Sequence, residues 1–338
     1  MDIKARNIST PTADAPATPP ASALAPVVGR FAPSPSGRMH LGNAFSALMS
    51  WLAARSRGGR VVLRIEDLDP RAQDRAAADR IVDDLAWLGL DWDAGPLRQS
   101  EDGADYGRAV EVLAGRGLTY PCFCTRAELH AASAPHLSDG TYVYQGTCRD
   151  LAPEEVARRS ERRSPATRLR VPRESDPAAL VSFRDLVYGE REEDLARACG
   201  DFLVRRSDGV FAYQLAVVLD DAAEGVTRVV RGRDLLGSTA RQVYLQRLLG
   251  LPTPEYAHVP LLVAPDGRRL AKRDGDLDLG ALRRRYTGPE PVVGRLAACV
   301  GLADAGEEVS AAELVERFSL DALRAHADDV VVGEGFLP

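Results

Sequence analysis

A proline-rich loop between a short apolar run and a periodic apolar stretch is the most constraining feature of this 338-residue chain. The loop, residues 30–43, follows Val27-Val28 and leads into apolar positions spaced through 45–52. This pattern predicts a strand, a loop braced by prolines, and a helix. His40 and Gly42 fall at the junction of loop and helix. Unpaired backbone N–H groups and the helix dipole favour phosphate at such a junction.

A second apolar run, Val61–Ile65, follows about one helix length later and predicts a buried strand. A strand, a helix and a strand joined by short connections indicate a parallel α/β unit. The second strand leads into Glu66, at the carboxyl end where open α/β sheets gather their ligand residues. A helical stretch over residues 71–88, closed by Gly89, follows it. The predicted fold class is therefore α/β with a parallel sheet.

Bulk properties exclude several classes of protein. The chain is 45% hydrophobic and 27% charged, which is typical of a soluble globular protein. No apolar stretch approaches the ~20 residues of a membrane span. A net charge of −6 excludes a generally basic nucleic-acid binder, so such a partner would need a local basic surface. Five cysteines without an export signal argue against a disulfide framework.

The loop sequence resembles a known family. Pro33-x-Pro-x-Gly37-x-x-His40-Leu-Gly-Asn43 is similar to the HIGH-type signature of class I aminoacyl-tRNA synthetases. The segment Arg-Phe-Ala-Pro-Ser-Pro-Ser-Gly, which begins at Arg30, resembles the glutamyl branch of that family. The resemblance implies a class I synthetase, Rossmann-like parallel-sheet catalytic domain.

One lysine stands out in an arginine-rich chain. Of 43 lysines and arginines, only Lys4 and Lys272 are lysines, and Lys4 falls in the N-terminal tail. The compact ammonium of lysine suits phosphate. The segment from Arg269 to Arg273 resembles the KMSKS loop of class I synthetases in its position and in Lys272. It departs from that signature at Arg269 and Ala271.

The two signatures together imply activation of a carboxylate by ATP, with Mg²⁺ on the phosphates. Charge then accumulates on phosphoryl oxygens, so catalysis is mostly positioning and electrostatic stabilisation. His40 and Lys272 are the implied catalytic residues. The implied ATP-binding residues are Pro33, His40, Gly42, Asn43 and Lys272.

The amino-acid substrate implied by the resemblance is L-glutamate. Glu66 suits its ammonium group, while Arg30 and Arg231 offer planar guanidinium groups to carboxylates. Tyr213 adds a hydroxyl. The implied glutamate-binding residues are Arg30, Phe31, Ala32, Pro33, Ser34, Glu66, Tyr213 and Arg231. Arg231 is favoured for the side-chain carboxylate, although the sequence does not apportion the two arginines.

Three cysteines, Cys122, Cys124 and Cys148, form a further constellation. Thiolates separated by a loop hold Zn²⁺ in a tetrahedral site, and three of them leave one position open. The alternatives for this position are Tyr144, Tyr142, His136 and His130. Chemistry alone favours histidine, whereas the resemblance favours Tyr144 through Cys-x-Cys and Tyr-x-x-x-Cys. A structural zinc ion is expected, because the surrounding insertion is poor in apolar residues.

The chain divides into segments of different character. Strands are predicted at 166–171, 181–187 and 226–230. A hairpin is predicted over 201–213, with its turn at 207–209. Helices are expected at 238–249, 291–302 and 310–325. The expected divisions are a disordered tail at 1–25, catalytic halves at 26–118 and 196–250, a zinc-bearing insertion at 119–195, a KMSKS-like and stem-contact region at 251–290, and a short helical part at 291–338.

Only 66 residues follow Lys272, which is too few for the anticodon-binding region of a glutamyl-tRNA synthetase. A short catalytic core with this cysteine insertion resembles the glutamyl-queuosine tRNA(Asp) synthetases. That resemblance implies glutamate activation without tRNA, then transfer to the queuosine base at the wobble position of tRNA(Asp). The alternatives are a truncated synthetase that charges the tRNA 3′ end and a non-catalytic tRNA-binding paralogue. A cytoplasmic monomer without a membrane partner is expected.

Overall fold

The computed structural model describes residues 26–35, 37–131, 143–268, 270, 278–333 and 335–337. The predicted tail at 1–25 and Lys272 lie outside this part of the chain.

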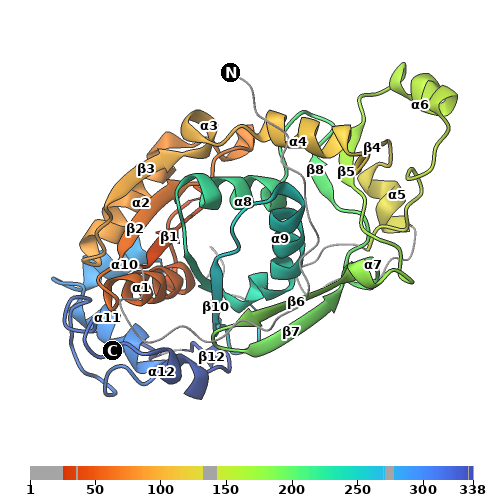
Figure 1. The fold of residues 1–338 in the computed structure, drawn as a ribbon. Coiled ribbons are helices and arrows are strands. Elements are labelled where there is room, and N and C mark those ends of the chain that lie inside the picture. Colours follow the sequence, from red (N-terminus) through yellow and green to blue (C-terminus); the bar gives the residue numbers. More distant parts are fainter. Residues whose placement is uncertain are drawn as a thin grey trace, which may run out of the picture.

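Two sheets form the centre of the molecule (Figure 1). In the first, strands run parallel in the order β1 (Val28–Phe31), β2 (Arg60–Ile65) and β3 (Ala94–Arg98). The second has the order β7 (Gly189–Asp194), β6 (Leu180–Asp185), β10 (Glu255–Val259) and β9 (Arg228–Gly232). Only β7 is antiparallel to its neighbour.

A backbone hydrogen bond joins the two sheets. The N–H of Thr227 donates to the carbonyl of Val28 at 2.9 Å, which lays the start of β9 beside β1. The chain therefore reverses its winding direction between β1 and β9, the type of position at which open α/β sheets bind ligands. The predicted α/β class with parallel strands is confirmed.

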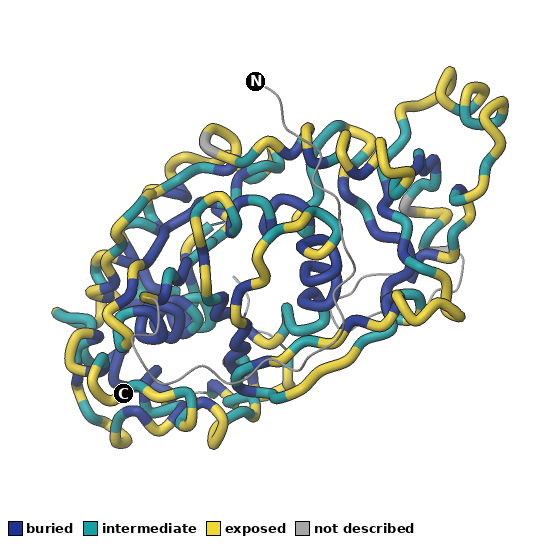
Figure 2. Tube along the Cα trace, viewed as in Figure 1, coloured by how far each residue is buried: buried dark blue, intermediate teal, exposed yellow. Residues whose placement is uncertain are grey.

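The helices pack on both sides of this core. Their bounds are α1 (Leu41–Arg55), α2 (Arg75–Trp87), α3 (Gln99–Asp102), α4 (Tyr106–Gly115), α5 (Arg126–Ala131), α6 (Pro153–Ser160), α7 (Leu195–Ala198), α8 (Tyr213–Ala223), α9 (Leu236–Leu249), α10 (Leu279–Arg285), α11 (Glu290–Ala298) and α12 (Leu320–Ala325). Figure 2 shows α1 and α9 buried along most of their length. No helix within the described ranges is long and apolar enough to cross a membrane.

Local sequence explains how α1 and its neighbours begin and end. At Gly29 an added Cβ would lie 3.1 Å from the Cβ of Ala54, so glycine lets β1 approach α1 closely. Asp74 caps α2, because its side chain accepts a hydrogen bond from the N–H of Ala77 at 3.0 Å. Gly250 ends α9 with a φ of +67°, a left-handed conformation that glycine adopts without strain.

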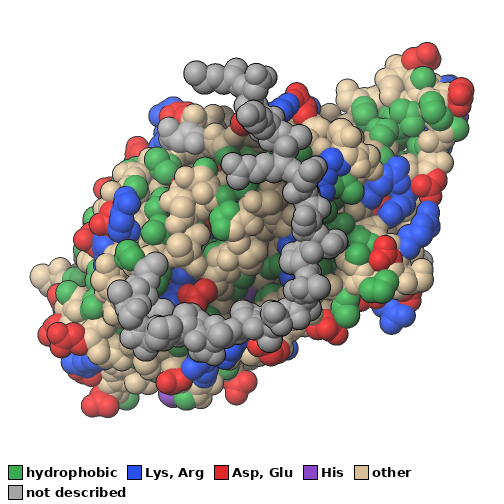
Figure 3. Space-filling view, in the orientation of Figure 1, with side chains coloured by type: hydrophobic (Ala, Val, Ile, Leu, Met, Phe, Trp, Pro, Cys, Tyr) green, Lys and Arg blue, Asp and Glu red, His purple; other side chains and the backbone are tan. Residues whose placement is uncertain are grey.

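A smaller lobe stands out at one end of the molecule, opposite the C-terminal helices (Figure 1). Its antiparallel sheet has the order β4 (Thr119–Cys122), β5 (Ala166–Leu169) and β8 (Leu203–Arg205). Helix α6 in this lobe has no buried residue. Figure 3 shows basic side chains on this end of the molecule, interspersed with acidic ones. At the other end, β11 (Leu262–Val263) pairs with β12 (Val330–Val331).

Several elements differ from the sequence-based expectations. The predicted strand at 181–187 pairs with β10 and so belongs to the central sheet rather than to the small lobe. The second arm of the predicted hairpin stops near Phe211, because α8 begins at Tyr213. The predicted helix at 310–325 is helical only from Leu320, where the Ser319 side chain caps the N–H of Ala322.

Candidate active site

A cavity of about 660 Å³ opens at the carboxyl ends of β1, β2 and β9, against the N-terminus of α1. It contains every sequence-predicted substrate residue that the structure describes. These are Arg30, Phe31, Ala32, Pro33, Ser34, His40, Gly42, Asn43, Glu66, Tyr213 and Arg231. Lys272 lies outside the described residues. Residues far apart in the sequence thus converge on one cavity.

The N-terminus of α1 forms one wall of the cavity. His40 is the N-cap residue, and its backbone N–H donates to the side-chain oxygen of Asn43 at 3.3 Å. An added Cβ at Gly42 would lie 3.2 Å from the His40 ring, so glycine keeps this end of the helix open. The arrangement matches the general preference of helix N-termini for anions and is suited to phosphate.

The segment that carries Lys272 is bounded by residues of this region. Leu270 lines the cavity, and Asp278 forms an antiparallel bridge with His40. The N–H of Leu279 also donates to the carbonyl of Met39 at 2.9 Å. The start of α10 is therefore joined to the loop that precedes α1.

Arg30, at the end of β1, lies in a network of charges. Its Nε is 3.3 Å from a carboxylate oxygen of Asp221. Arg64 on β2 lies 2.7 Å from Asp221, 2.5 Å from Glu224 and 3.5 Å from Glu66. All these side chains are at least largely buried. The network places opposite charges beneath the floor of the cavity.

This network lowers the pKa of one of its carboxyl groups, whereas the pKa of another is raised. Burial would raise the pKa of Asp221, but Arg30 and Arg64 outweigh it and hold that pKa below its ordinary value. Burial raises the pKa of Glu66, and Arg64 and Arg30 oppose the rise only in part. Glu66 lines the cavity, so a cation bound beside it would favour its ionised form.

Arg231, on β9, has different partners. Its Nε donates to Nε2 of His258 at 3.0 Å, and its Nη2 donates to Oγ1 of Thr239 at 2.9 Å. Nη2 also lies 3.3 Å from the carbonyl oxygen of Leu235. Its Nη1 is buried and has no hydrogen-bond partner among the residues that the structure describes. Arg231 lines the cavity, so it has a guanidinium donor left for a ligand.

His258 and Asp185 lie behind Arg231. Nδ1 of His258 is 2.6 Å from a carboxylate oxygen of Asp185, and both side chains are fully buried. Burial lowers the pKa of His258, Asp185 opposes this and Arg231 adds to it, and together they bring the pKa to about 4. Burial would raise the pKa of Asp185, but the hydrogen bond with His258 outweighs it and leaves that pKa lowered. At neutral pH the pair is therefore a neutral imidazole and a carboxylate.

Sequence reasoning did not find four of these supporting residues: Arg64, Asp221, Asp185 and His258. Asp221 contacts Arg30 across 191 positions of sequence, and Asp185 contacts His258 across 73. A buried arginine inside the apolar run Val61–Ile65 was the one available signal. An arginine within an otherwise apolar strand requires carboxylate partners elsewhere in the chain.

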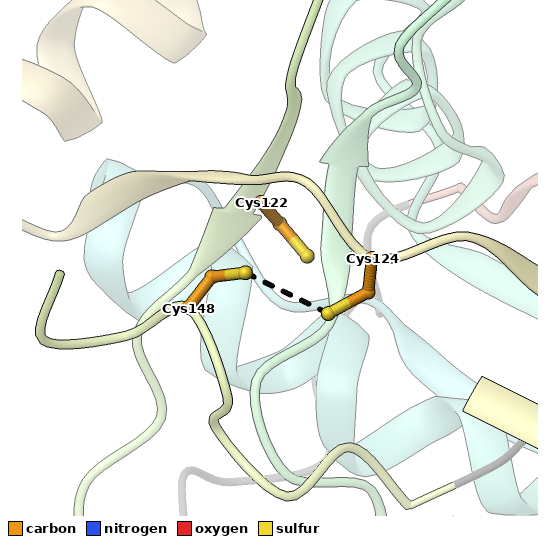
Figure 4. A group of neighbouring side chains, drawn as sticks. All are labelled: Cys122, Cys124 and Cys148. Atoms are coloured by element: carbon orange, nitrogen blue, oxygen red, sulfur yellow. Dashed lines mark hydrogen bonds between the residues drawn. The ribbon is translucent and has the colours of Figure 1, made fainter. Parts of the chain in front are cut away.

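The three predicted cysteines come together in the small lobe. Figure 4 shows the side chains of Cys122, Cys124 and Cys148 pointing toward a common centre. Their sulfur atoms all lie within 4.8 Å of one another, and those of Cys124 and Cys148 are 3.6 Å apart. The hydroxyl of Tyr144 lies 3.5 Å from the sulfur of Cys122 and 3.7 Å from that of Cys124.

These separations fit a tetrahedral zinc site. A Zn–S distance of about 2.3 Å implies roughly 3.8 Å between two ligand sulfurs and roughly 3.5 Å between a ligand sulfur and a ligand oxygen. Three separations are close to these values: Cys124 to Cys148, Cys122 to Tyr144 and Cys124 to Tyr144. Of the other candidate ligands, Tyr142, His136 and the side chain of His130 lie outside the described part of the chain.

Arg168, on β5, supports this centre. Its Nε donates to the sulfur of Cys122 at 3.2 Å, and its guanidinium carbon lies 3.7 Å from the centre of the Tyr144 ring. Burial would raise the pKa of Cys122, but the charge of Arg168 and the hydrogen bonds of Tyr144 and Arg168 hold it below its ordinary value. This favours the thiolate, which is the form that binds metal.

Comparison with known proteins accords with this geometry. The model of the tRNA synthetases class I (E and Q), catalytic domain, matches residues 26–327. A glutamyl-Q tRNA(Asp) synthetase of Symbiobacterium thermophilum is 50% identical over 304 residues, which cover 86% of this chain and 92% of that protein. The protein of the same name from Nitratidesulfovibrio vulgaris is 49% identical over 81% of this chain and 86% of its own length.

A solved structure gives the same result. The glutamate tRNA ligase of Elizabethkingia meningosepticum, in complex with its amino acid, superposes with a TM-score of 0.77 at 27% identity. The superposition covers 93% of this chain and 68% of that chain. The chain therefore belongs to the class I tRNA synthetases (E and Q), with the glutamyl-Q tRNA(Asp) synthetases among its relatives.

Proposed function

We propose that this protein uses ATP to form glutamyl-adenylate from L-glutamate without tRNA, and then transfers glutamate to the queuosine base at the wobble position of tRNA(Asp). The observation that carries the first step is the convergence of Glu66, Arg231 and the N-terminus of α1 on one cavity. These groups are complementary to an ammonium, a carboxylate and a phosphate, respectively.

Glutamate presents three charged groups that this cavity can bind separately. Its ammonium pairs with Glu66, whose pKa burial raises despite Arg64 and Arg30, so that a further cation favours the ionised form. Its side-chain carboxylate accepts from Nη1 of Arg231, the donor without a partner in the described part of the chain. Arg30 and Tyr213 complete the wall. The α-carboxylate is left facing the phosphate end of the cavity.

The proposed reaction joins that α-carboxylate to ATP. A carboxylate oxygen attacks the α-phosphorus, the bond to the bridging oxygen of the β-phosphate breaks, and pyrophosphate leaves with that electron pair. Negative charge grows on the phosphoryl oxygens, so positioned donors lower the barrier. His40 and the backbone N–H groups of α1 are such donors, and Lys272, two residues beyond Leu270 in the sequence, is a proposed third. Mg²⁺ enters with the ATP.

Zinc is proposed as a structural group in the small lobe, held by Cys122, Cys124, Cys148 and Tyr144. The lobe has a small apolar core around these residues. A metal that crosslinks both ends of the intervening loop contributes folding free energy to such a lobe. The division of the chain into two catalytic halves around an insertion is also proposed, because the sheet of β4, β5 and β8 is separate from the two central sheets.

The acceptor is supported by the relatives. Two of them, at 49–50% identity over most of the chain, are glutamyl-Q tRNA(Asp) synthetases. Solvent-accessible arginines of the small lobe, Arg158, Arg159 and Arg173, are the proposed contacts to RNA phosphates on a chain with a net charge of −6.

The test is glutamate-dependent exchange of pyrophosphate into ATP without tRNA, followed by labelled glutamate with tRNA(Asp) that bears or lacks queuosine. The proposal predicts exchange without tRNA and label only on the queuosine-bearing tRNA. Exchange that requires tRNA, with label at the 3′ end, would indicate a tRNA-charging enzyme. Absence of exchange under both conditions would indicate a non-catalytic RNA-binding protein.

Lys272 provides a second test. Lys272→Ala should lower adenylate formation by on the order of 10²–10³, as for the loss of one transition-state donor. The matched control is Arg268→Ala, since Arg268 pairs with Asp266 in the same segment. Normal exchange by Lys272→Ala would remove Lys272 from the mechanism.

A further inference from the structure

Asp185 and His258 are buried and lie outside the cavity, yet they are joined to the arginine that we assign to the substrate carboxylate. His258 on β10 is the register partner of Arg231 on β9. Asp185 is the last residue of β6, on the other side of β10. The three side chains therefore form a row across three neighbouring strands, from the sheet interior to the cavity.

We propose that Asp185 and His258 are positioning residues that fix the direction of the Arg231 guanidinium and thereby set the affinity for the side-chain carboxylate of glutamate. This inference rests on the proposed function, since it concerns how Arg231 binds that substrate.

The chemistry of the row allows one arrangement of protons. The Nε of Arg231 only donates hydrogen bonds, so Nε2 of His258 must accept at their 3.0 Å contact. Nδ1 of His258 must then carry the hydrogen and donate to the Asp185 carboxylate at 2.6 Å. A protonated ring would lose the acceptor and bring two cations together. The row therefore requires a neutral ring with the proton on Nδ1.

Three contacts hold the Arg231 guanidinium on its remaining sides. Nη2 donates to Thr239 and Leu235, and the guanidinium carbon lies 5.4 Å from the centre of the Tyr256 ring. The Tyr256 and His258 rings are parallel to within 11°. With Nε and Nη2 fixed, Nη1 is the donor left for the ligand. A change at His258 should therefore redirect Nη1 without removing the charge of Arg231.

Asp185 itself is held in one orientation. Its Oδ1 accepts from the backbone N–H groups of Val187 and Tyr188 at 2.9 and 2.8 Å. Its Oδ2 is the atom that faces His258. In Asp185→Asn the amide oxygen must stay on the two backbone donors, so the amide NH₂ must face Nδ1 of His258. The ring then needs its proton on Nε2, where it meets the N–H of Arg231.

Two variants test this geometry. Asp185→Asn is nearly isosteric but breaks the hydrogen-bond pattern of the row, whereas His258→Gln conserves it. Asp185→Asn should raise the KM for glutamate by on the order of 10–100-fold, as for a lost hydrogen bond to a charged group. The KM for ATP should not change. His258→Gln places an amide N–H toward Asp185 and an amide oxygen toward Arg231, so it should retain the KM for glutamate to within about threefold, less than one hydrogen bond.

The experiment is ATP–pyrophosphate exchange by the full chain, with glutamate and ATP varied separately. A selective rise in the KM for glutamate in Asp185→Asn, with retention in His258→Gln, supports the inference. An unchanged KM for glutamate in Asp185→Asn overturns it. Equal losses for glutamate and ATP also overturn it, because they indicate a general structural role. Exchange by the wild type first establishes that the proposed function holds.

A measurement on the wild type keeps the inference testable if Asp185→Asn does not fold or if exchange is absent. Nitrogen NMR of histidine-labelled protein distinguishes the Nδ1–H ring, the Nε2–H ring and the imidazolium, and the His258 signal is assigned by its loss in His258→Gln. A neutral His258 with its proton on Nδ1 near pH 7 supports the row. An Nε2–H ring or an imidazolium overturns it, whatever the enzyme assay shows.

Discussion

Two buried arginines, Arg30 and Arg231, line the same cavity, but one has a charged partner and the other has neutral partners. Arg30 lies against Asp221, and Asp221 also pairs with Arg64. Arg231 makes its hydrogen bonds to an imidazole, a hydroxyl and a backbone carbonyl, which are all neutral groups. The charge of Arg30 is therefore balanced by the protein, whereas that of Arg231 is not balanced by its direct partners.

This difference indicates which arginine serves which purpose. A buried charge without a charged partner is unfavourable, so it is retained where a ligand supplies the opposite charge. By this argument Arg231 is suited to the side-chain carboxylate of glutamate. Arg30 is suited to holding the floor of the cavity, together with Arg64. The sequence did not distinguish the roles of Arg30 and Arg231, whereas their hydrogen-bond partners in the structure do.

The strongest test of the comparison is removal of the carboxylate that balances Arg30. Asp221→Asn leaves two buried arginines short of a partner, so we expect a loss of about 3–5 kcal/mol in the free energy of unfolding. Urea unfolding measures it. The control Glu101→Gln removes an exposed ion pair with Arg75 and should cost under about 1 kcal/mol. Similar losses in both variants would mean that the Arg30 network is not a structural support.

Replacement of Arg231 should impair the use of glutamate rather than stability. Arg231→Gln should lower kcat/KM for glutamate by on the order of 10²–10³, because a buried charge pair with the substrate is lost. The KM for ATP and the unfolding free energy should change little. Arg228→Gln on the same strand is the control, since Arg228 pairs with Glu255 and does not line the cavity. A stability loss as large as that of Asp221→Asn would contradict the distinction between the two arginines.

The same contrast explains what the sequence could predict. Residues such as His40 and Glu66 lie at strand ends and helix starts that short-range patterns locate, so their convergence was predictable. Asp221 and His258 act through contacts between distant segments, which no local pattern encodes. Strand β3 (Ala94–Arg98) was missed for a related reason. It contains glycine and proline and lacks β-branched residues, and it forms because β2 is beside it.

The Arg30 network also predicts a dependence of stability on pH. Asp220 also belongs to this network, 4.0 Å from Arg64, so four carboxyl groups (Glu66, Asp220, Asp221 and Glu224) face Arg30 and Arg64. Burial raises the pKa of Glu224 from 4.5 to about 7, with the charges of Asp221 and Asp220 adding to the rise and Arg64 opposing it. The folded protein thus holds a proton that the unfolded chain releases above pH 4.5. This contribution is fully present below pH 4.5 and is lost as the pH rises through about 7.

Glu224→Gln should remove that dependence. The shift corresponds to about 3 kcal/mol, so the variant should lose about that much less stability than the wild type between pH 4.5 and 7.5. Urea unfolding at both pH values measures the difference. Glu255→Gln, which alters an exposed pair with Arg228, should keep the slope of the wild type. An identical slope in Glu224→Gln would show that its carboxyl is not the group that titrates.

A buried arginine of the small lobe extends the comparison, with the smallest expected effect. Arg168 faces a thiol rather than a carboxylate or a cavity, donating to Cys122 at 3.2 Å while it covers the Tyr144 ring. Its role should follow from these partners, so Arg168→Met should weaken zinc binding by about 10–100-fold, as for other groups that orient metal ligands.

Competition with a chromogenic chelator measures the affinity, with Cys122→Ser as the reference for loss of a ligand. Arg170→Met is the matched control, because Arg170 lies over Tyr120 and donates to Asp150 and to the backbone carbonyl of Arg149. Equal zinc affinity in both arginine variants would mean that the hydrogen bond to Cys122 contributes nothing, and that partners alone do not define the role of a buried arginine in this protein.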